Sequence, residues 1–166
     1  MVKKNIVITV LVLMLGVAAT HYLFQNEEKR VRKQFRMLSK LVSKDQDEDN
    51  FTMARKARDI AALFAENCQI ESHTSAFSGH YTRQEICGLA ARARFYFSKL
   101  TVHFHDLGID FPEKQTARAA VTGQASGTSK GGDPFIDEVL ELRCTLKKLD
   151  DTWLFNTIEV VEVLEE

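Results

Sequence analysis

The sequence predicts an α+β fold, in which three N-terminal helices pack on a curved antiparallel sheet of four to five strands. Apolar residues recur at helical spacing before Leu100 and alternate with polar residues from there onward. Each predicted strand has one apolar and one polar face, so the sheet needs cover on one side, which the apolar stripes of the helices supply. With 166 residues, 45% of them hydrophobic, the chain is long enough for one domain with a real core.

An apolar run from Ile6 to Phe24 precedes the predicted domain. At about 1.5 Å per residue it nearly crosses a hydrocarbon core of about 30 Å. The aromatic end Tyr22-Leu23-Phe24 favours an uncleaved anchor, whereas Val17-Ala18-Ala19 also permits a signal peptide cleaved after Ala19. We therefore expect a transmembrane or signal-anchor helix in residues 1–26, with membrane lipid as its partner, and a folded domain in residues 27–166.

The side of the membrane is argued from charge. Lys3 and Lys4 before the apolar run favour a single-pass protein with the domain on the extracytoplasmic side of a bacterial inner membrane. The basic residues after the run favour the cytoplasmic side, which stays open: Lys29, Arg30, Arg32, Lys33, Arg36 and Lys40. The same residues also suit a solvated helix face or anionic headgroups.

Two helices are predicted first in the folded part. The apolar stripe of residues 28–44 is Val31, Phe35, Leu38 and either Leu41 or Val42. Asp49 or Asn50 then caps a second helix with the stripe Met53, Ala57, Ile60 and Phe64.

A short extended segment is predicted near Cys68–Glu71. Thr82 with Glu85 three residues later forms a capping-box pattern, which opens a third helix from about Arg83 to Lys99. Arg92 and Arg94 are expected on the solvated face of this helix.

Long strands follow the third helix. Val102 and Phe104 face one side, and the parity reverses after Asp106, which predicts a β-bulge beside Gly108. A second strand begins at Thr116, and Gly127 to Pro134 is predicted as an exposed loop. The third strand is predicted over Leu140 to Lys147, and a turn at Asp150-Asp151 leads to the last strand. The apolar residues of that strand are first Trp153 and Phe155 and then, after a shift, Ile158 and Val160.

This order of elements resembles the nuclear-transport-factor-2-like superfamily, whose fold is a cystatin-like α+β cone. The resemblance covers about residues 28–163, and the segments that carry it are Phe104-His105-Asp106-Leu107, Thr116-Ala117-Arg118-Ala119, Leu142 to Lys148, and Trp153-Leu154-Phe155 before Ile158-Glu159-Val160. The resemblance implies a cavity between sheet and helices, in which enzymes of the superfamily place an Asp, His or Tyr. Because the fold also hosts ligand binders and interaction domains, function must be argued from the site.

The positions expected to face this cavity are apolar apart from the thiol of Cys144, so we assign no catalytic residue, no metal and no cofactor. His103 and His105 share one strand face and suit a shared metal, but that face lies outside the cone. Asp106 is a candidate general base, because a bulge can direct its side chain into the cavity; otherwise it only forms the bulge or turn. As residues of a binding pocket or its rim we name His73, His105, Asp106, Cys144 and Trp153.

Composition excludes several classes of protein. Residues 27–166 carry 20 basic and 23 acidic side chains, a net charge of −3, and no nucleic-acid-binding motif is visible. The three cysteines lie far apart without a CxxC pair, which favours buried free thiols over a zinc site or a disulfide framework.

We therefore predict a membrane-tethered binding or assembly domain without catalysis and with a protein partner still to be identified. The alternative is a small-ligand carrier, or a lyase- or isomerase-type enzyme, that uses the apolar cone cavity. The resemblance also implies a homodimer through the polar outer face of the sheet, formed by Thr101, His103, His105, Arg118, Arg143 and Thr145.

Overall fold

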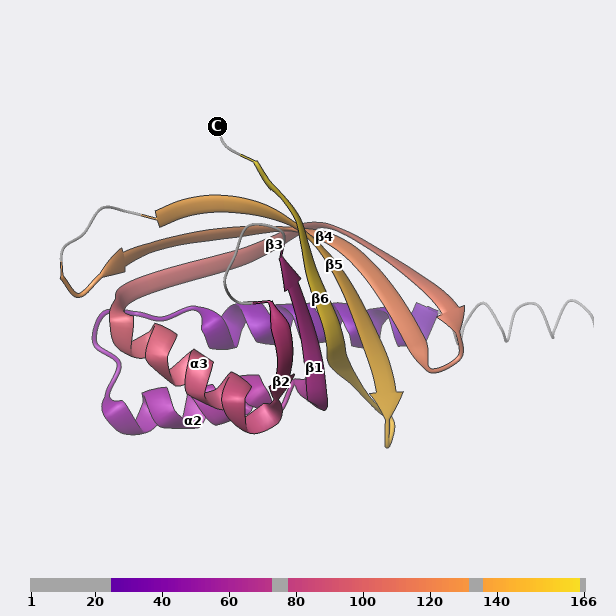
Figure 1. Ribbon diagram of the computed structural model, residues 1–166, viewed down its shortest axis with the longest axis horizontal. Coiled ribbons are helices and arrows are strands. Elements are labelled where there is room, and N and C mark those ends of the chain that lie inside the picture. The colour runs from indigo at the N-terminus through magenta and orange to yellow at the C-terminus, as the bar shows by residue number, and fades with distance from the viewer. Residues whose placement is uncertain (1–24, 73–77, 132–135, 165–166) are drawn as a thin grey trace, which may run out of the picture.

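The computed structural model describes residues 25–72, 78–131 and 136–164. In these residues three helices lie on one side of a curved sheet (Figure 1). The elements in chain order are an N-terminal helix over residues 25–42, α2 (Asn50–Ala61), β1 (Phe64–Ser72), β2 (Gly79–Thr82), α3 (Arg83–Tyr96), β3 (Phe97–Glu113), β4 (Thr116–Ser129), β5 (Ile136–Leu149) and β6 (Thr152–Leu164).

The sheet has six strands in the order β2-β1-β6-β5-β4-β3. All neighbours are antiparallel except β1 and β6, which are parallel. The α+β class is confirmed, but the predicted count of four to five strands was wrong. The unpredicted strand is β2, which has only four residues and forms by pairing with β1 from Asn67↔Thr82 to Ile70↔Gly79. Such a short segment shows no alternation of its own.

The helix boundaries follow the predicted caps. Asp49 caps α2 by accepting a hydrogen bond from the backbone of Thr52, and the capping box of Thr82 and Glu85 opens α3. The third helix ends at Tyr96 rather than Lys99, because the chain turns there to pair with β4.

Strand β4 continues to Ser129, so the predicted loop from Gly127 to Pro134 was wrong in its first residues. The small residues there mark close packing instead of a turn. A Cβ atom on Gly127 would lie 2.9 Å from the carbonyl oxygen of Lys99 and 3.1 Å from the side chain of Leu100. Only glycine fits this contact between β3 and β4.

Two local irregularities agree with their predictions. The register of β3 and β4 shifts between His105 and Gly108, and Asp106 has φ 52°, which confirms the bulge. Asp150 and Asp151 have φ 45° and 64°, so the β5–β6 hairpin closes with the two left-handed residues of a type I′ turn.

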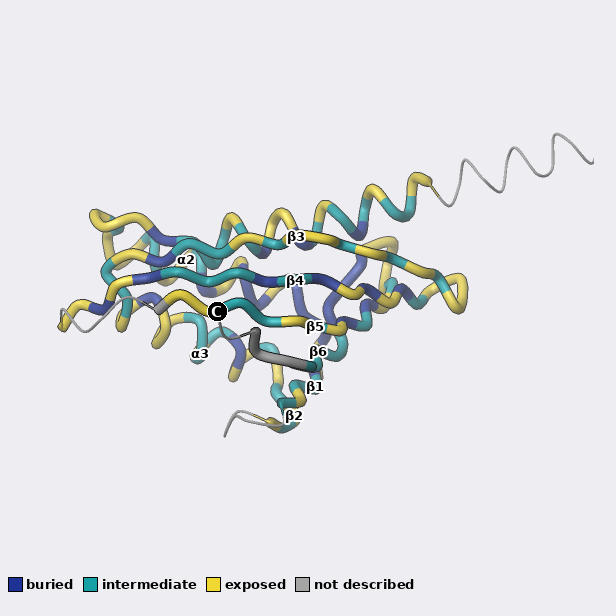
Figure 2. Tube along the Cα trace, turned by 90° about the horizontal axis from the view of Figure 1, so that it is seen from above, coloured by how far each residue is buried: buried dark blue, intermediate teal, exposed yellow. Residues whose placement is uncertain are grey.

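The core lies between the concave face of the sheet and the helices. Phe35 of the N-terminal helix packs edge-on against Phe104 and Phe155, with ring centroids 5.5 and 5.0 Å apart. Leu146 and Trp153 are at most 1% exposed in the same cluster. Figure 2 shows that β4 is more buried than the edge strand β3.

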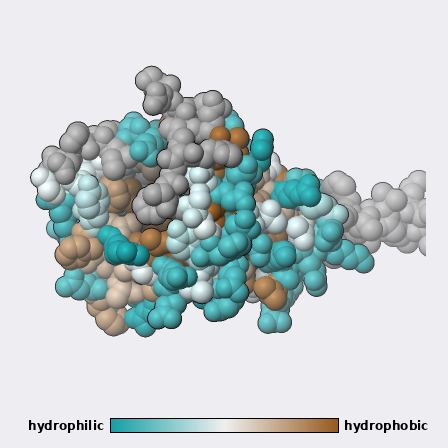
Figure 3. Space-filling view, viewed as in Figure 1, coloured by the Kyte–Doolittle hydropathy of each residue, from teal (hydrophilic) through white to brown (hydrophobic). Residues whose placement is uncertain are grey.

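Large apolar side chains are also exposed at one end of the molecule. Phe51 is the second residue of α2, Phe95 and Tyr96 end α3, and all three are more than half exposed. Figure 3 shows apolar surface gathering over this helical end, whereas the opposite end is mostly hydrophilic.

None of the helices within the described residues has the length and apolar composition needed to cross a membrane. The segment Ile6–Phe24 lies outside the described residues, so the anchor, its cleavage and the side of the membrane stay predictions.

A buried polar cluster closes the C-terminal end of the N-terminal helix. Arg94 is 1% exposed, donates to the carbonyl of Leu41 and forms an ion pair with Glu48. The Nζ of Lys44, also buried, donates to the carbonyl oxygens of Arg94 and Phe97 at 2.6 Å each. The cations satisfy carbonyl groups that helix ends leave unpaired. Placing Arg94 on a solvated face was therefore wrong.

Replacement of Arg94 by leucine tests this cluster. We expect the free energy of unfolding to fall by roughly 3 kcal/mol, because buried Glu48 keeps only Lys56 of its two cationic partners and the carbonyl groups of Leu41 and Val42 lose their donor. Urea unfolding followed by circular dichroism measures the change. Arg92→Leu on the exposed side of the same helix is the matched control and should have a small effect; equal losses for the two variants would contradict the structural role of Arg94.

Candidate functional site

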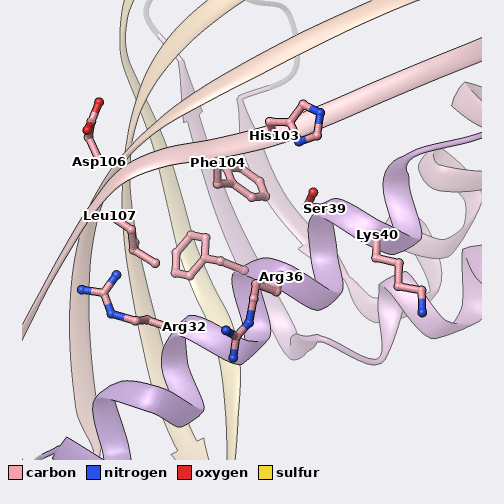
Figure 4. A pocket seen from close by; sticks show the side chains of 9 residues that line it. Arg32, Arg36, Ser39, Lys40, His103, Phe104, Asp106 and Leu107 are labelled. Atoms are coloured by element: carbon pink, nitrogen blue, oxygen red, sulfur yellow. The ribbon is translucent and has the colours of Figure 1, made fainter.

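A groove with a cavity volume of about 460 Å³ runs between the N-terminal helix and β3 (Figure 4). We call it the helix–β3 groove. It is lined by Arg32, Phe35, Arg36, Ser39, Lys40, His103, Phe104, Asp106 and Leu107. The volume lies within the range of small-molecule sites, about 300–1,000 Å³.

The helix is attached directly to β3 beyond one end of the groove. The hydroxyl of Ser39 donates to the carbonyl of Val102 at 2.6 Å, and the backbone N–H of Val102 donates to the hydroxyl of Ser43 at 3.0 Å. The backbones of Lys44 and Leu100 exchange two further hydrogen bonds of 2.7 and 3.0 Å. The spacing between helix and strand is therefore fixed here.

The start of the helix is attached instead to the β5–β6 hairpin, through what we call the Glu27 cluster. The carboxylate of Glu27 accepts hydrogen bonds from the indole N–H of Trp153 at 2.7 Å, from Lys148 at 2.9 Å and from Arg30 at 3.2 Å. Asp151 pairs with Arg30 at 2.8 Å and with Lys148 at 2.9 Å.

The cluster is fully charged at neutral pH. Burial by itself raises the pKa of Glu27, but hydrogen bonds from Lys148 and Trp153 and the nearby positive charges outweigh this effect and hold the pKa below its ordinary value. Hydrogen bonds from Arg30 and Lys148 lower the pKa of Asp151. The helix is thus held at this end by charge-assisted hydrogen bonds.

The groove opens between these two attachments, and its floor is apolar. Phe35 and Phe104 meet edge-to-face there, and Figure 4 shows Phe104 and Leu107 directed from β3 toward the helix. An apolar ligand group placed on this floor would be removed from water on two sides.

The helix side of the groove is cationic. Arg32, Arg36 and Lys40 follow one another every four residues, and Figure 4 shows Arg32 reaching toward β3. Arg32 pairs with Glu28 at 2.8 Å. Among the described residues, neither Arg36 nor Lys40 has an acidic partner. The groove therefore joins an apolar floor to a surplus of positive charge.

Of the residues named from the sequence, Asp106 lines the groove, but its carboxylate points away from the helix in Figure 4. It also borders a hollow of about 280 Å³ with Glu141 and Arg143 on the outer side. The ring of exposed His105 lies with its centroid 6.1 Å from that of His103, which lines the groove. His73 lies outside the described residues.

Cys144 and Trp153 lie in the core and not at the groove, each at most 3% exposed. Burial, with a smaller contribution from Cys68, raises the pKa of the Cys144 thiol to about 12, and burial raises that of Cys68 to about 11. Both sulfur atoms are therefore protonated and unreactive at neutral pH.

The groove offers polar groups for an anion. No cluster of three or more His, Cys, Asp or Glu side chains suited to a metal occurs in the part of the chain that the structure describes.

The outer-face residues proposed for a homodimer are exposed or half-buried. Such a dimer stays a prediction.

The helix side of the groove was not predicted from the sequence. Arg32, Arg36 and Lys40 were expected on a solvated face or against anionic headgroups, although their four-residue spacing places them along one flank of the helix beside Phe35. That spacing was the available signal, but the nearness of β3 was not visible.

No family model and no curated protein matches this chain. Solved structures do. A putative scytalone dehydratase from Novosphingobium aromaticivorans is 18% identical over 86% of this chain and 89% of its own, with a TM-score of 0.65. A hexachlorocyclohexane dehydrochlorinase, LinA-type3, from Novosphingobium barchaimii is 10% identical over 84% and 90%, with a TM-score of 0.64.

A third structure, a nuclear-transport-factor-2-like protein with a cystatin-like fold from Novosphingobium aromaticivorans, is 15% identical over 86% of this chain and 85% of its own, with a TM-score of 0.65. The chain therefore has the nuclear-transport-factor-2-like, cystatin-like fold, as the sequence predicted. At these identities the similarity shows the fold alone.

Glu27→Gln tests the Glu27 cluster. We expect a loss of roughly 2 kcal/mol at neutral pH, because the charged acceptor of two cations and the indole is removed. The folded pKa of Glu27 lies below its ordinary value, so its contribution is present above that value and disappears as the pH falls through the folded pKa.

Urea unfolding of the wild type and of the Glu27→Gln variant, followed by the fluorescence of Trp153, measures their difference in free energy of unfolding from neutral to acidic pH. The two stability curves should converge at low pH. A gap that stays constant as the pH falls would show that the charge of Glu27 is not what stabilises the helix.

Proposed function

We propose that this domain is a non-catalytic binding module, which takes an organic anion with an apolar body in the helix–β3 groove. We further propose that Ile6–Phe24 tethers it to a membrane. The observation that carries the proposal is the meeting of the Phe35–Phe104 floor with Arg36 and Lys40, two cations without an acidic partner among the described residues.

The two parts of the groove select for two parts of one ligand. Burial of apolar surface on the floor contributes about 25 cal/mol per Å². A carboxylate or phosphate beside the floor gains charge-assisted hydrogen bonds from the guanidinium of Arg36 and the ammonium of Lys40. An inorganic anion lacks the first contribution, and a neutral apolar molecule lacks the second.

The packed interior of the cone supports a non-catalytic role. Leu146, Phe155 and the thiol of Cys144 face the cone, belong to one packed cluster and are at most 3% exposed. They include no acid–base pair. The carboxylate of Asp106 points away from the groove floor. These features support ligand binding rather than catalysis as the role of the domain.

Naphthyl phosphate is a suitable probe, because it joins a flat apolar body to an anion. We expect naphthyl phosphate to bind the full chain at least about tenfold more tightly than naphthol. Arg36→Gln should weaken the binding of naphthyl phosphate about tenfold, because it removes one charge-assisted hydrogen bond. Isothermal titration calorimetry measures both.

Arg55→Gln on the exposed face of α2 is the matched control, because it removes the same charge far from the groove lining. Phe104→Ala should weaken naphthyl phosphate and naphthol alike. Equal affinity for the two probes, or equal effects of the Arg36 and Arg55 variants, would rule out the groove as an anion site.

A lyase- or isomerase-type enzyme is the second candidate. His103 lines the groove beside Phe104, and two of the structural neighbours carry names of elimination enzymes, a dehydratase and a dehydrochlorinase. Because the described interior is packed, such an activity would belong to the groove, with the imidazole of His103 as the base that removes a proton from carbon.

Proton exchange tests this candidate. An enzyme of this class should exchange the acidic C–H protons of phenylacetone in D₂O faster than buffer does, and His103→Gln should abolish the excess while His105→Gln retains it. Proton magnetic resonance follows the exchange. If the excess is absent, the binding module stands without the enzymatic role for this probe class.

A further inference from the structure

An exposed basic stripe runs along the N-terminal helix. Its four members are separated by four, three and four residues, so they share one face: Lys29, Lys33, Arg36 and Lys40. All four side chains are exposed, and within the described residues none has an acidic partner. The two acids of the helix, Glu27 and Glu28, are already paired with Arg30, Lys148 and Arg32.

Such a stripe is unfavourable in isolation, because like charges four residues apart on a helix repel each other. Eleven residue steps at about 1.5 Å each make it about 16 Å long, so Lys29 and Lys33 extend the positive charge beyond the groove, whose lining includes only Arg36 and Lys40 of the four. Met37, 37% exposed, lies beside Lys33 and Arg36 and adds an apolar side chain to the same region.

The position of the stripe in the chain indicates its partner. The apolar segment Ile6–Phe24 ends one residue before the described helix begins, and Lys29 follows five residues after Phe24. A nucleic-acid partner is disfavoured, because residues 27–166 carry a net charge of −3 and the stripe holds no aromatic side chain for base stacking.

We infer that the basic stripe lies against the anionic headgroups of the bilayer that holds Ile6–Phe24, so that the N-terminal helix rests along the membrane surface. The inference rests on the proposed tether. Anionic lipids attract juxtamembrane basic residues over about a Debye length, so the contact is sensitive to salt.

Lysine acetylation tests the contact on the native, full-length chain. The protein is reconstituted in vesicles of phosphatidylcholine, with or without phosphatidylglycerol, and acetylation by an N-hydroxysuccinimide ester is quantified at each lysine by mass spectrometry. Lys29, Lys33 and Lys40 should react about fivefold more slowly on the anionic vesicles at low salt. High salt should restore their rates.

The chain contains its own controls. Lys99 and Lys147 on the sheet and Lys114 in the β3–β4 turn are exposed and should react equally on both vesicles. Equal rates for the stripe lysines on both vesicles would overturn the inference, as would protection by a DNA duplex but not by anionic vesicles.

The proposed tether is tested by a separate measurement of vesicle binding. Retention on phosphatidylcholine vesicles at high salt reports Ile6–Phe24 alone, because the stripe has no anionic partner there. If the protein leaves these vesicles, the proposed tether fails. Slower acetylation of the stripe on anionic vesicles at low salt would still support a headgroup contact, whereas its absence would overturn that contact as well.

Discussion

The hydrogen bond from the indole of Trp153 to Glu27 is the constraint on which the arrangement of the helix depends. Trp153 is 1% exposed, and a buried N–H without an acceptor is costly. Glu27 supplies this acceptor only if the helix starts above the β5–β6 hairpin. The aromatic contacts of Phe35 with β3 and β6 then follow from the helix direction.

Attachment at both ends also explains why a groove exists at all. The helix meets the hairpin at its start and β3 near its end, which are different parts of a twisted sheet. Between them, helix and edge strand are bridged by Phe35, Phe104 and Leu107, whose side chains form a floor but do not close the surface. The cations on the helix flank stay near this floor because their backbone is held at two points.

Local features were predictable from the sequence, because neighbouring residues determine them. The capping box at Thr82, the bulge at Asp106 and the Asp150-Asp151 turn each have a short-range signature. Features that depend on distant partners were not predictable. Strand β2 needs β1, and Arg94 is buried because Glu48 and the end of another helix meet it. The groove combines residues about 70 positions apart in the sequence, so only its individual residues were visible.

The Glu27 cluster has a mechanical consequence. It lies at the beginning of the described helix, so tension arriving along the chain from its N-terminus reaches this cluster before the rest of the domain. The cluster passes that load to the hairpin of β5 and β6, two inner strands of the sheet that are paired along most of their length. The edge strand β3, which would peel away most readily, lies outside this first load path. A domain built in this way resists being pulled from its N-terminal end.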